Sequence, residues 1–256
     1  MKFRVIAAGL LVVAGFSGNC YAAAPRTEGL NLELTPYVWG AGMDGKLKRG
    51  VYSTNFNYSF SDLVDKVDAG FMGLAIVSYD RFVLYTDYDY IGLNDSGKAN
   101  GGLLPAGTKV KGDLTLQIGT YAVGYRFDTF GENTIDVLVG AQLTDLNTKL
   151  QIQTVATNLD TKDNLTDTVV MLRPSFQISE KWRFNPTLTY GISGDSDATY
   201  VMMPQVQYDF SKSFALRLGY KRQHWKLENG SKNTPSYSQK DITLSGPFLG
   251  VGWTFP

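Results

Sequence analysis

The chain has 256 residues with 24 Lys and Arg against 24 Asp and Glu, so no cationic excess points to a nucleic-acid partner. Its aromatic share is 13% and it holds 27 glycines, which is typical of a β-rich chain that meets an interface. No run of eighteen apolar residues follows the N-terminal segment, so the rest of the sequence predicts no transmembrane helix.

The N-terminal segment has the organisation of a secretory signal. Lys2 and Arg4 precede an apolar core, and small residues follow, with cleavage expected after Ala22. A lipoprotein signal ending at Cys20 is the poorer interpretation, because Asn19 stands where a small residue is needed. We therefore predict a cleaved signal peptide at 1–22, a single barrel domain at 23–256 without a thiol, and a location in the bacterial outer membrane.

Alternating apolar residues then recur along the mature chain. Runs begin near residues 30, 46, 68, 82, 113, 134, 168, 182, 198, 214 and 241, and only 61–68 suggests a short helix. Either the first two runs, ELTPYVWGAGMDG and KLKRGVYSTNFNYSF, belong to one irregular hairpin region, or a further short strand precedes Pro36. Because a single-chain bacterial barrel has an even number of strands, the eleven runs leave ten or twelve.

The connections between the runs differ in length. Segments 79–82, 127–133, 178–182 and 210–214 are short turns, whereas 94–112, 153–168 and 228–240 are long and polar. This organisation is that of an outer-membrane barrel, with short periplasmic turns and longer extracellular loops. A soluble sandwich would carry frequent Lys and Glu on its polar face, whereas here that face holds mainly Gly, Thr, Gln, Asn and Arg. The predicted fold class is an all-β, antiparallel transmembrane barrel of 10–12 strands.

The chain ends with the alternating segment FLGVGWTFP. We expect Leu249, Val251, Trp253 and Phe255 to face lipid in the closing strand. The segment also resembles the C-terminal signal that the barrel assembly machinery recognises, although Pro256 follows the terminal aromatic residue.

Several ordered motifs resemble those of uncharacterised proteobacterial outer-membrane β-barrel proteins. They are TPYVWGAGMDGKL, FSDLVDKVDAGFMG, DRFVLYTDYDYIGLN, VGYRFD, IDVLVGAQLTDLNTKL, ISEKWRF, YDFSKSFALRLGYKRQHW and LSGPFLGVGWTF. The resemblance covers nearly all of the mature chain and implies the fold and the location. It implies no reaction, and so no functional residue.

Candidate catalytic residues are few. Barrel lipid hydrolases place His and Ser two residues apart, but Lys226 and Arg222 occupy those positions around His224, the sole histidine. Asp87 and Asp89 match the paired acids of omptin-like proteases, but the matching Asp-x-His pair is missing. No Cys or multi-His cluster suits a transition metal. The loop acids at 160, 163 and 167 are better interpreted as solvated than as calcium ligands.

A set of charged residues projects inward in the register that the apolar rows define. It comprises Asp87, Asp89, Arg126, Asp136, Arg173, Arg183, Asp209, Arg217 and Lys221. Buried charges are costly unless they are paired or hydrated, so these residues predict ion pairs that brace the lumen. The alternative is a narrow polar pore in which the arginines select anions.

The predicted function is accordingly that of a monomeric, non-enzymatic barrel with a structural or narrow-channel role. A surface-facing hydrolase of lipid or peptide, and a protein that binds or adheres through its loops, remain as alternatives. We expect no cofactor and no nucleic-acid partner. Outer-membrane lipid and the barrel assembly machinery are the expected partners.

Overall fold

The computed structural model describes residues 29–50, 52–98, 109–152, 157–232 and 234–255. The predicted signal peptide at 1–22 lies outside this part of the chain. The strands and the helix are, in chain order, β1 (Leu30–Trp39), β2 (Gly42–Arg49), β3 (Tyr52–Tyr58), α1 (Phe60–Val64), β4 (Val67–Tyr79), β5 (Phe82–Lys98), β6 (Lys109–Asp128), β7 (Thr134–Ile152), β8 (Thr157–Gln177), β9 (Trp182–Phe184), β10 (Thr187–Gly194), β11 (Ala198–Met203), β12 (Gln205–Asp209), β13 (Phe214–Asn229) and β14 (Ser238–Phe255).

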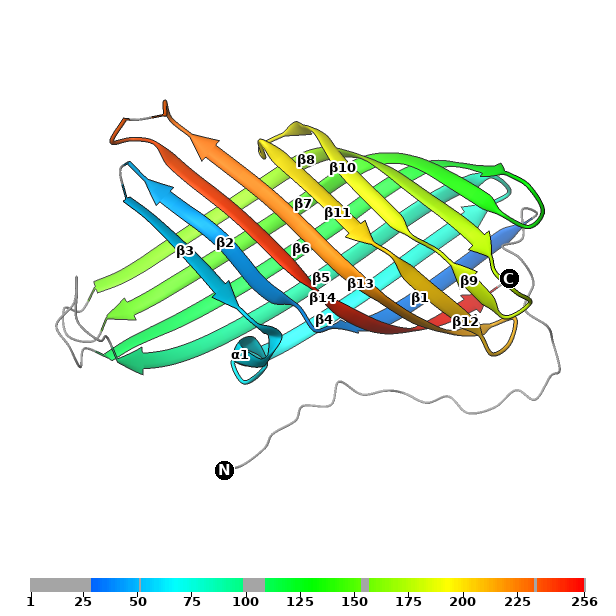
Figure 1. The fold of residues 1–256 in the computed structure, drawn as a ribbon, viewed down its shortest axis with the longest axis horizontal. Coiled ribbons are helices and arrows are strands. Elements are labelled where there is room, and N and C mark those ends of the chain that lie inside the picture. The colour runs from blue at the N-terminus through cyan, green and yellow to red at the C-terminus, as the bar shows by residue number, and fades with distance from the viewer. Residues whose placement is uncertain (1–28, 51, 99–108, 153–156, 233, 256) are drawn as a thin grey trace.

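These fourteen segments form one antiparallel sheet with a ring of ten strands. Fourteen segments make ten strands of the ring because four of these strands are interrupted, and each interrupted strand counts as two segments. A passage of the chain from one end of the barrel to the other is called a crossing here. The two-segment crossings are β1 with β2, β3 with β4, β9 with β10, and β11 with β12. Pro186 and Pro204 stand at two of these interruptions, where a residue without an N–H group cannot donate to the ladder. Pairing of β1 with β14 closes the ring (Figure 1). The fold-class prediction is confirmed, and the count is ten.

The eleven runs seen in the sequence become ten strands because the run from residue 46 to residue 60 is divided. Its first residues end the first crossing in β2, and its remainder begins the second crossing in β3. The second crossing then bulges outward as α1 before β4 resumes it. Ser59 caps this helix in a capping box with Asp62, which fixes the point where the strand leaves the sheet. In the described part of the chain no helix is long and apolar enough to cross a membrane.

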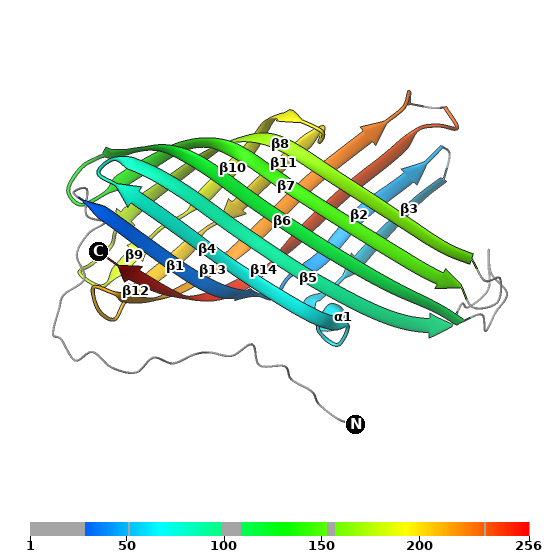
Figure 2. The same cartoon turned by 180° about the vertical axis from the view of Figure 1, so that it is seen from behind.

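The two ends of the barrel differ. The four short turns and the C-terminus lie at one end, called the turn end here, and the remaining connections lie at the opposite, loop end (Figures 1 and 2). Strands extend further toward the loop end than the sequence predicted, since β5 reaches Lys98, β6 starts at Lys109 and β8 starts at Thr157. Polar residues remain in strand conformation there because each extended strand pairs with its neighbour along its full length.

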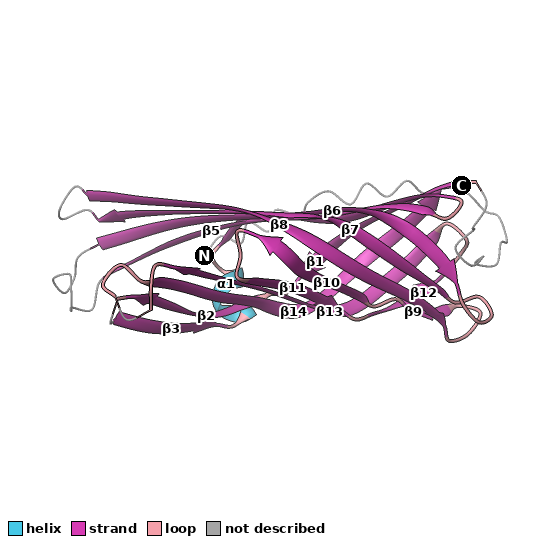
Figure 3. Ribbon diagram, turned by 90° about the horizontal axis from the view of Figure 1, so that it is seen from above, coloured by secondary structure: helices cyan, strands magenta, loops and turns pink. Residues whose placement is uncertain are grey.

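At the loop end the ring separates into two four-stranded sheets. One consists of β5, β6, β7 and β8, and the other of β3, β2, β14 and β13. Among the described residues β3 pairs only with β2, and residues 94–98 of β5 pair only with β6. On the other side, β10 pairs with β8 only as far as Asp167. Figure 3 shows the two sheets as separate layers at the end away from the C-terminus.

Two inward-facing glycines lie where β6 and β7 approach each other closely. A Cβ atom at Gly124 would lie 2.0 Å from the Val137 carbonyl oxygen, and one at Gly140 would lie 1.9 Å from that of Tyr121. Backbone atoms cannot move aside as a flexible side chain can. Glycine is therefore required at both positions, where the backbone of the paired strand comes too close for a Cβ atom.

Candidate functional site

The centre of the barrel holds a group of four side chains from three strands, called the Lys221 cluster here. Lys221 Nζ on β13 lies 2.7 Å from Asp87 Oδ2 and 2.6 Å from Asp89 Oδ2, both on β5. It also donates to Tyr37 Oη on β1 at 2.7 Å, and the Tyr37 hydroxyl lies within 2.8 Å of both carboxylates. The relative exposure of Lys221 is 0% and that of Asp89 is 1%. Every proton of the ammonium group therefore has an acceptor.

Strand alternation explains why these side chains meet. Asp87 and Asp89 are two residues apart on β5, so both point to the interior, as does Lys221 on β13. Glu33, Thr35, Tyr37 and Trp39 share the inward face of β1 in the same way. The Trp39 ring lies 5.1 Å from Lys221 Nζ, and so adds a cation–π contact to the ion pairs.

A second set of ion pairs lies nearer the turn end. Arg126 forms a bidentate pair with Asp136, at 2.6 and 2.9 Å, and Arg173 approaches the same carboxylate at 3.0 Å. Arg173 also lies over the Tyr85 ring, 5.1 Å from its centroid. Because one carboxylate serves two guanidinium groups, the aromatic face provides further stabilisation for the extra positive charge.

Two more arginines complete this layer. Arg183 on β9 pairs with Asp209 on β12 at 3.2 Å. Arg217 on β13 pairs with Glu33 on β1 at 2.6 Å. The arginine side chains are 4–5% exposed, so both guanidinium groups are shielded from bulk water. The Arg183–Asp209 pair joins two hydrogen-bonded strands, whereas the Arg217–Glu33 pair spans β14, which lies between β13 and β1. Breaking either buried pair leaves an uncompensated charge.

The structure places all nine residues of the predicted charge network inside the barrel. They fall into four groups: Lys221 with Asp87 and Asp89, Arg126 and Arg173 with Asp136, Arg183 with Asp209, and Arg217 with Glu33. Sequence reasoning missed Glu33, Tyr37 and Trp39. The alternation in ELTPYVW would have found them, since it sets these residues opposite the lipid-facing Leu34 and Val38.

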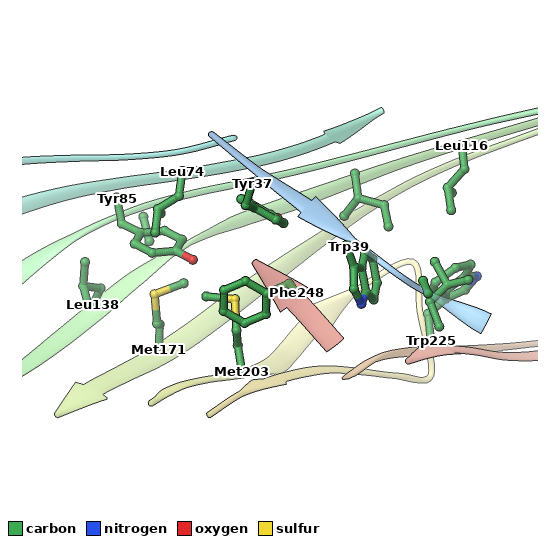
Figure 4. Packing of buried hydrophobic residues seen from close by; sticks show 14 of the residues in the cluster. Tyr37, Trp39, Leu74, Tyr85, Leu116, Leu138, Met171, Met203, Trp225 and Phe248 are labelled. Atoms are coloured by element: carbon green, nitrogen blue, oxygen red, sulfur yellow. The ribbon is translucent and has the colours of Figure 1, made fainter. Parts of the chain in front are cut away.

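Apolar side chains fill the interior between and beyond the charged groups. Toward the turn end Tyr85, Leu138 and Met171 pack together, and toward the loop end Leu116, Trp39 and Trp225 do so (Figure 4). All six are at most 5% exposed. Polar side chains link the walls as well, since Gln142 accepts from Thr199 at 2.8 Å and donates to Thr120 at 3.1 Å. The described interior is therefore packed at mid-barrel.

The elements of a hydrolytic site are not brought together. His224 lies on the outer face of β13, where it stacks on Tyr200 at 4.9 Å and contacts the Thr243 hydroxyl at 3.1 Å. Asp87 and Asp89 face the interior and pair with Lys221 instead.

Two of the three acidic positions considered for calcium, Asp163 and Asp167, have other protein partners. Asp163 forms an ion pair with Lys240, and Asp167 accepts hydrogen bonds from the backbone and hydroxyl of Ser196. The side chain of residue 160 lies outside the described part of the structure. Among the described residues no group of three potential ligands could hold a metal ion.

The C-terminal segment forms the end of β14. Leu249 and Phe255 are 46% and 48% exposed on the outer face, and Val251 and Trp253 share that face with partial burial. Trp253 packs edge-on against Phe214, 5.8 Å between centroids. With Phe210 and Trp182 these rings form an aromatic belt at the turn end, as transmembrane barrels have at their interfaces.

The ten-stranded closed ring, the apolar outer face and the belt define a transmembrane β-barrel of the outer-membrane class. Among solved structures, the outer-membrane protease OmpT from Escherichia coli matches with a TM-score of 0.58 and 8% identity, over 90% of this chain and 98% of that one. The translocator domain of the autotransporter NalP from Neisseria meningitidis matches with a TM-score of 0.43 and 14% identity, over 90% and 89% of the two chains. Ail from Yersinia pestis matches with a TM-score of 0.38 and 11% identity, over 89% and 99%. No protein-family model matches the chain, and neither does any curated protein.

Proposed function

We propose that this protein is a non-enzymatic outer-membrane barrel whose lumen is braced and closed by internal ion pairs. The observation that carries the proposal is the Lys221 cluster, in which a fully buried ammonium group joins two opposite walls at mid-barrel. A conducting pore needs hydrated charges that an ion can approach. Here each charged group already has a protein partner, and apolar layers lie on both sides.

The same geometry supports the absence of a hydrolase. Activation of a water by an acid and an imidazole requires both within hydrogen-bond reach of one point. The only histidine lies on the outer face and the acid pair lies inside. The likeness to OmpT rests on the fold, and at 8% identity it does not extend to a reaction.

The proposal includes export by the predicted signal peptide and insertion by the barrel assembly machinery as a monomer. It also includes membership of the family of uncharacterised proteobacterial outer-membrane barrels that the motifs resemble. Both rest on the sequence alone.

Arg217→Ala tests bracing against conduction. Bracing predicts a loss of roughly 2–4 kcal/mol, somewhat below the usual cost of breaking a buried pair because the Glu33 side chain is 21% exposed. Thermal unfolding in detergent measures this loss, and conductance should stay at the baseline. Altered ion selectivity with unchanged stability would instead establish the arginine as part of a pore.

A second function is favoured by the loop end, namely the binding of a ligand there. About 9–11 residues of a tilted strand cross a bilayer, yet β6 and β8 have 20 and 21 residues. Roughly half of each strand therefore stands beyond the apolar band. A purely structural barrel does not need such extensions, whereas a binding protein uses them to form a receptor surface. Removing the extensions should abolish ligand binding and leave the barrel folded.

A further inference from the structure

Among the described side chains, the interior of the loop end is largely apolar, which is unusual for a transmembrane barrel, whose lumen is normally polar. Inward-facing apolar residues come from both of the separated sheets: Ile91, Leu114 and Leu146 from β5, β6 and β7, and Met43, Phe56 and Leu227 from β2, β3 and β13. We call this set the apolar mouth. Its members are half-buried, whereas Leu116, Trp225 and Leu244 beneath them are at most 3% exposed.

An ion pair crosses the apolar mouth. Lys240 on β14 pairs with Asp163 on β8, and so joins the two sheets. Lys240 lies opposite Leu227 in the ladder, and Asp163 lies opposite Leu146, so both charges sit among apolar side chains. Their side chains are 33% and 24% exposed. The pair is thus accessible from the loop end, unlike the Lys221 cluster below it.

Apolar surface with an accessible cation, Lys240, at its rim complements a particular chemistry. We propose that the apolar mouth binds a single-chain amphiphile with an anionic head, such as a free fatty acid, from the loop-end side. Its chain lies between the two sheets above Trp225, and its head replaces Asp163 as the partner of Lys240. The proposal rests on the second function above and names its ligand.

The openings between the sheets are consistent with this ligand. Among the described residues, neither β3 nor the end of β5 has a strand partner across the gap between them. In the described part of the chain, no hydrogen-bond ladder therefore joins the two sheets at this gap. A chain can enter when the Lys240–Asp163 pair exchanges, with no strand pairing to break.

The test is quenching of tryptophan fluorescence by bromine-labelled dodecanoate, with the protein in phospholipid nanodiscs to keep detergent out of the apolar mouth. Trp182→Phe and Trp253→Phe remove the outward-facing indoles, which leaves Trp39 and Trp225 as reporters inside the barrel. We expect quenching by the labelled dodecanoate to saturate. Quenching by the cationic control, bromine-labelled dodecyltrimethylammonium, should not saturate. Quenching that rises linearly with both probes is simple partition into the bilayer, and it would overturn the proposal.

Replacing the two charged residues should change the affinity for dodecanoate in opposite directions. Lys240→Gln should weaken dodecanoate binding about tenfold, the equivalent of one charge-assisted hydrogen bond. Asp163→Asn should tighten binding several-fold, because it removes the competing carboxylate. If the pair only holds the sheets together, both variants shift binding in the same direction, and the proposal fails.

Two further variants serve as controls. Lys226 pairs with Glu228 on the outer face at 2.5 Å, so Lys226→Gln should leave the affinity unchanged. Leu114→Asp places an acid in the apolar mouth on the sheet away from Lys240 and should abolish binding, while circular dichroism verifies the fold. If dodecanoate does not bind but the protein also shows no conductance, only the amphiphile proposal is refuted. If the protein conducts ions but still binds dodecanoate, only the bracing function is refuted.

Discussion

Replacement of Lys221 by methionine removes the central charge and keeps the length and the apolar stem of the side chain. It leaves Asp87 and Asp89 facing each other without a cation, at 6% and 1% exposure. Breaking a buried pair in this way costs about 3–5 kcal/mol, because the remaining charge stays desolvated. The Lys221→Met variant should therefore unfold at a lower temperature by roughly 6–20 °C for a chain of this size.

The neutral triple variant sharpens this prediction. Lys221→Met combined with Asp87→Asn and Asp89→Asn leaves no unpaired charge, so most of the lost stability should return. Heat-induced unfolding in detergent, followed by circular dichroism, measures all three proteins. Lys226→Met on the outer face is the control and should change the midpoint little. A Lys221→Met variant within about 1 kcal/mol of the parent would refute the bracing argument.

Other consequences follow from particular residues. Gly140→Ala should cost about 1–3 kcal/mol of stability or block assembly, because the added Cβ would overlap the Tyr121 carbonyl oxygen. Gly70→Ala should be tolerated, because its Cβ would lie 3.8 Å from the nearest atom, the Tyr90 carbonyl oxygen. Heat-modifiability on gels measures the folded fraction of both variants. Ser59→Ala removes the cap of α1 and should cost about 1 kcal/mol in equilibrium urea unfolding; an unchanged midpoint would mean that packing alone holds the helix. At the loop end, the hydrogen bond from Lys226 lowers the folded-state pKa of Glu228, so this pair stabilises the fold above the unfolded pKa and loses that contribution as the pH falls. Glu228→Gln should accordingly lose less stability than the parent on acidification, as thermal midpoints at neutral and acidic pH would show.

The period of the chain predicted the barrel and the inward set of charges because alternation determines which face each residue takes. Arg126, Arg173 and Asp136 could be assigned to the interior in this way, but which of them pair depends on the stagger between strands, which the sequence does not encode locally. The apolar mouth was missed for a related reason. Leu114 and Leu116 alternate as lipid-facing residues do, although they share the parity of the inward-facing Arg126 on β6. Their packing against the buried core shows that they face inward.

The loops illustrate the opposite error. Segments 94–112 and 153–168 are rich in Gly, Asn, Asp and Thr, so composition favours turns there. The structure nevertheless continues β5, β6 and β8 into them, because backbone pairing with an adjacent extended strand outweighs weak local propensity. Such pairing is a non-local effect and cannot be inferred from one segment at a time.

Conductance of the refolded protein in a planar lipid bilayer tests the central claim most directly. A lumen closed by the Lys221 cluster and the apolar layers predicts a silent membrane across the applied voltages, with folded protein verified in the same bilayer lipid. Discrete openings of constant size, absent with protein-free lipid, would contradict the closed lumen.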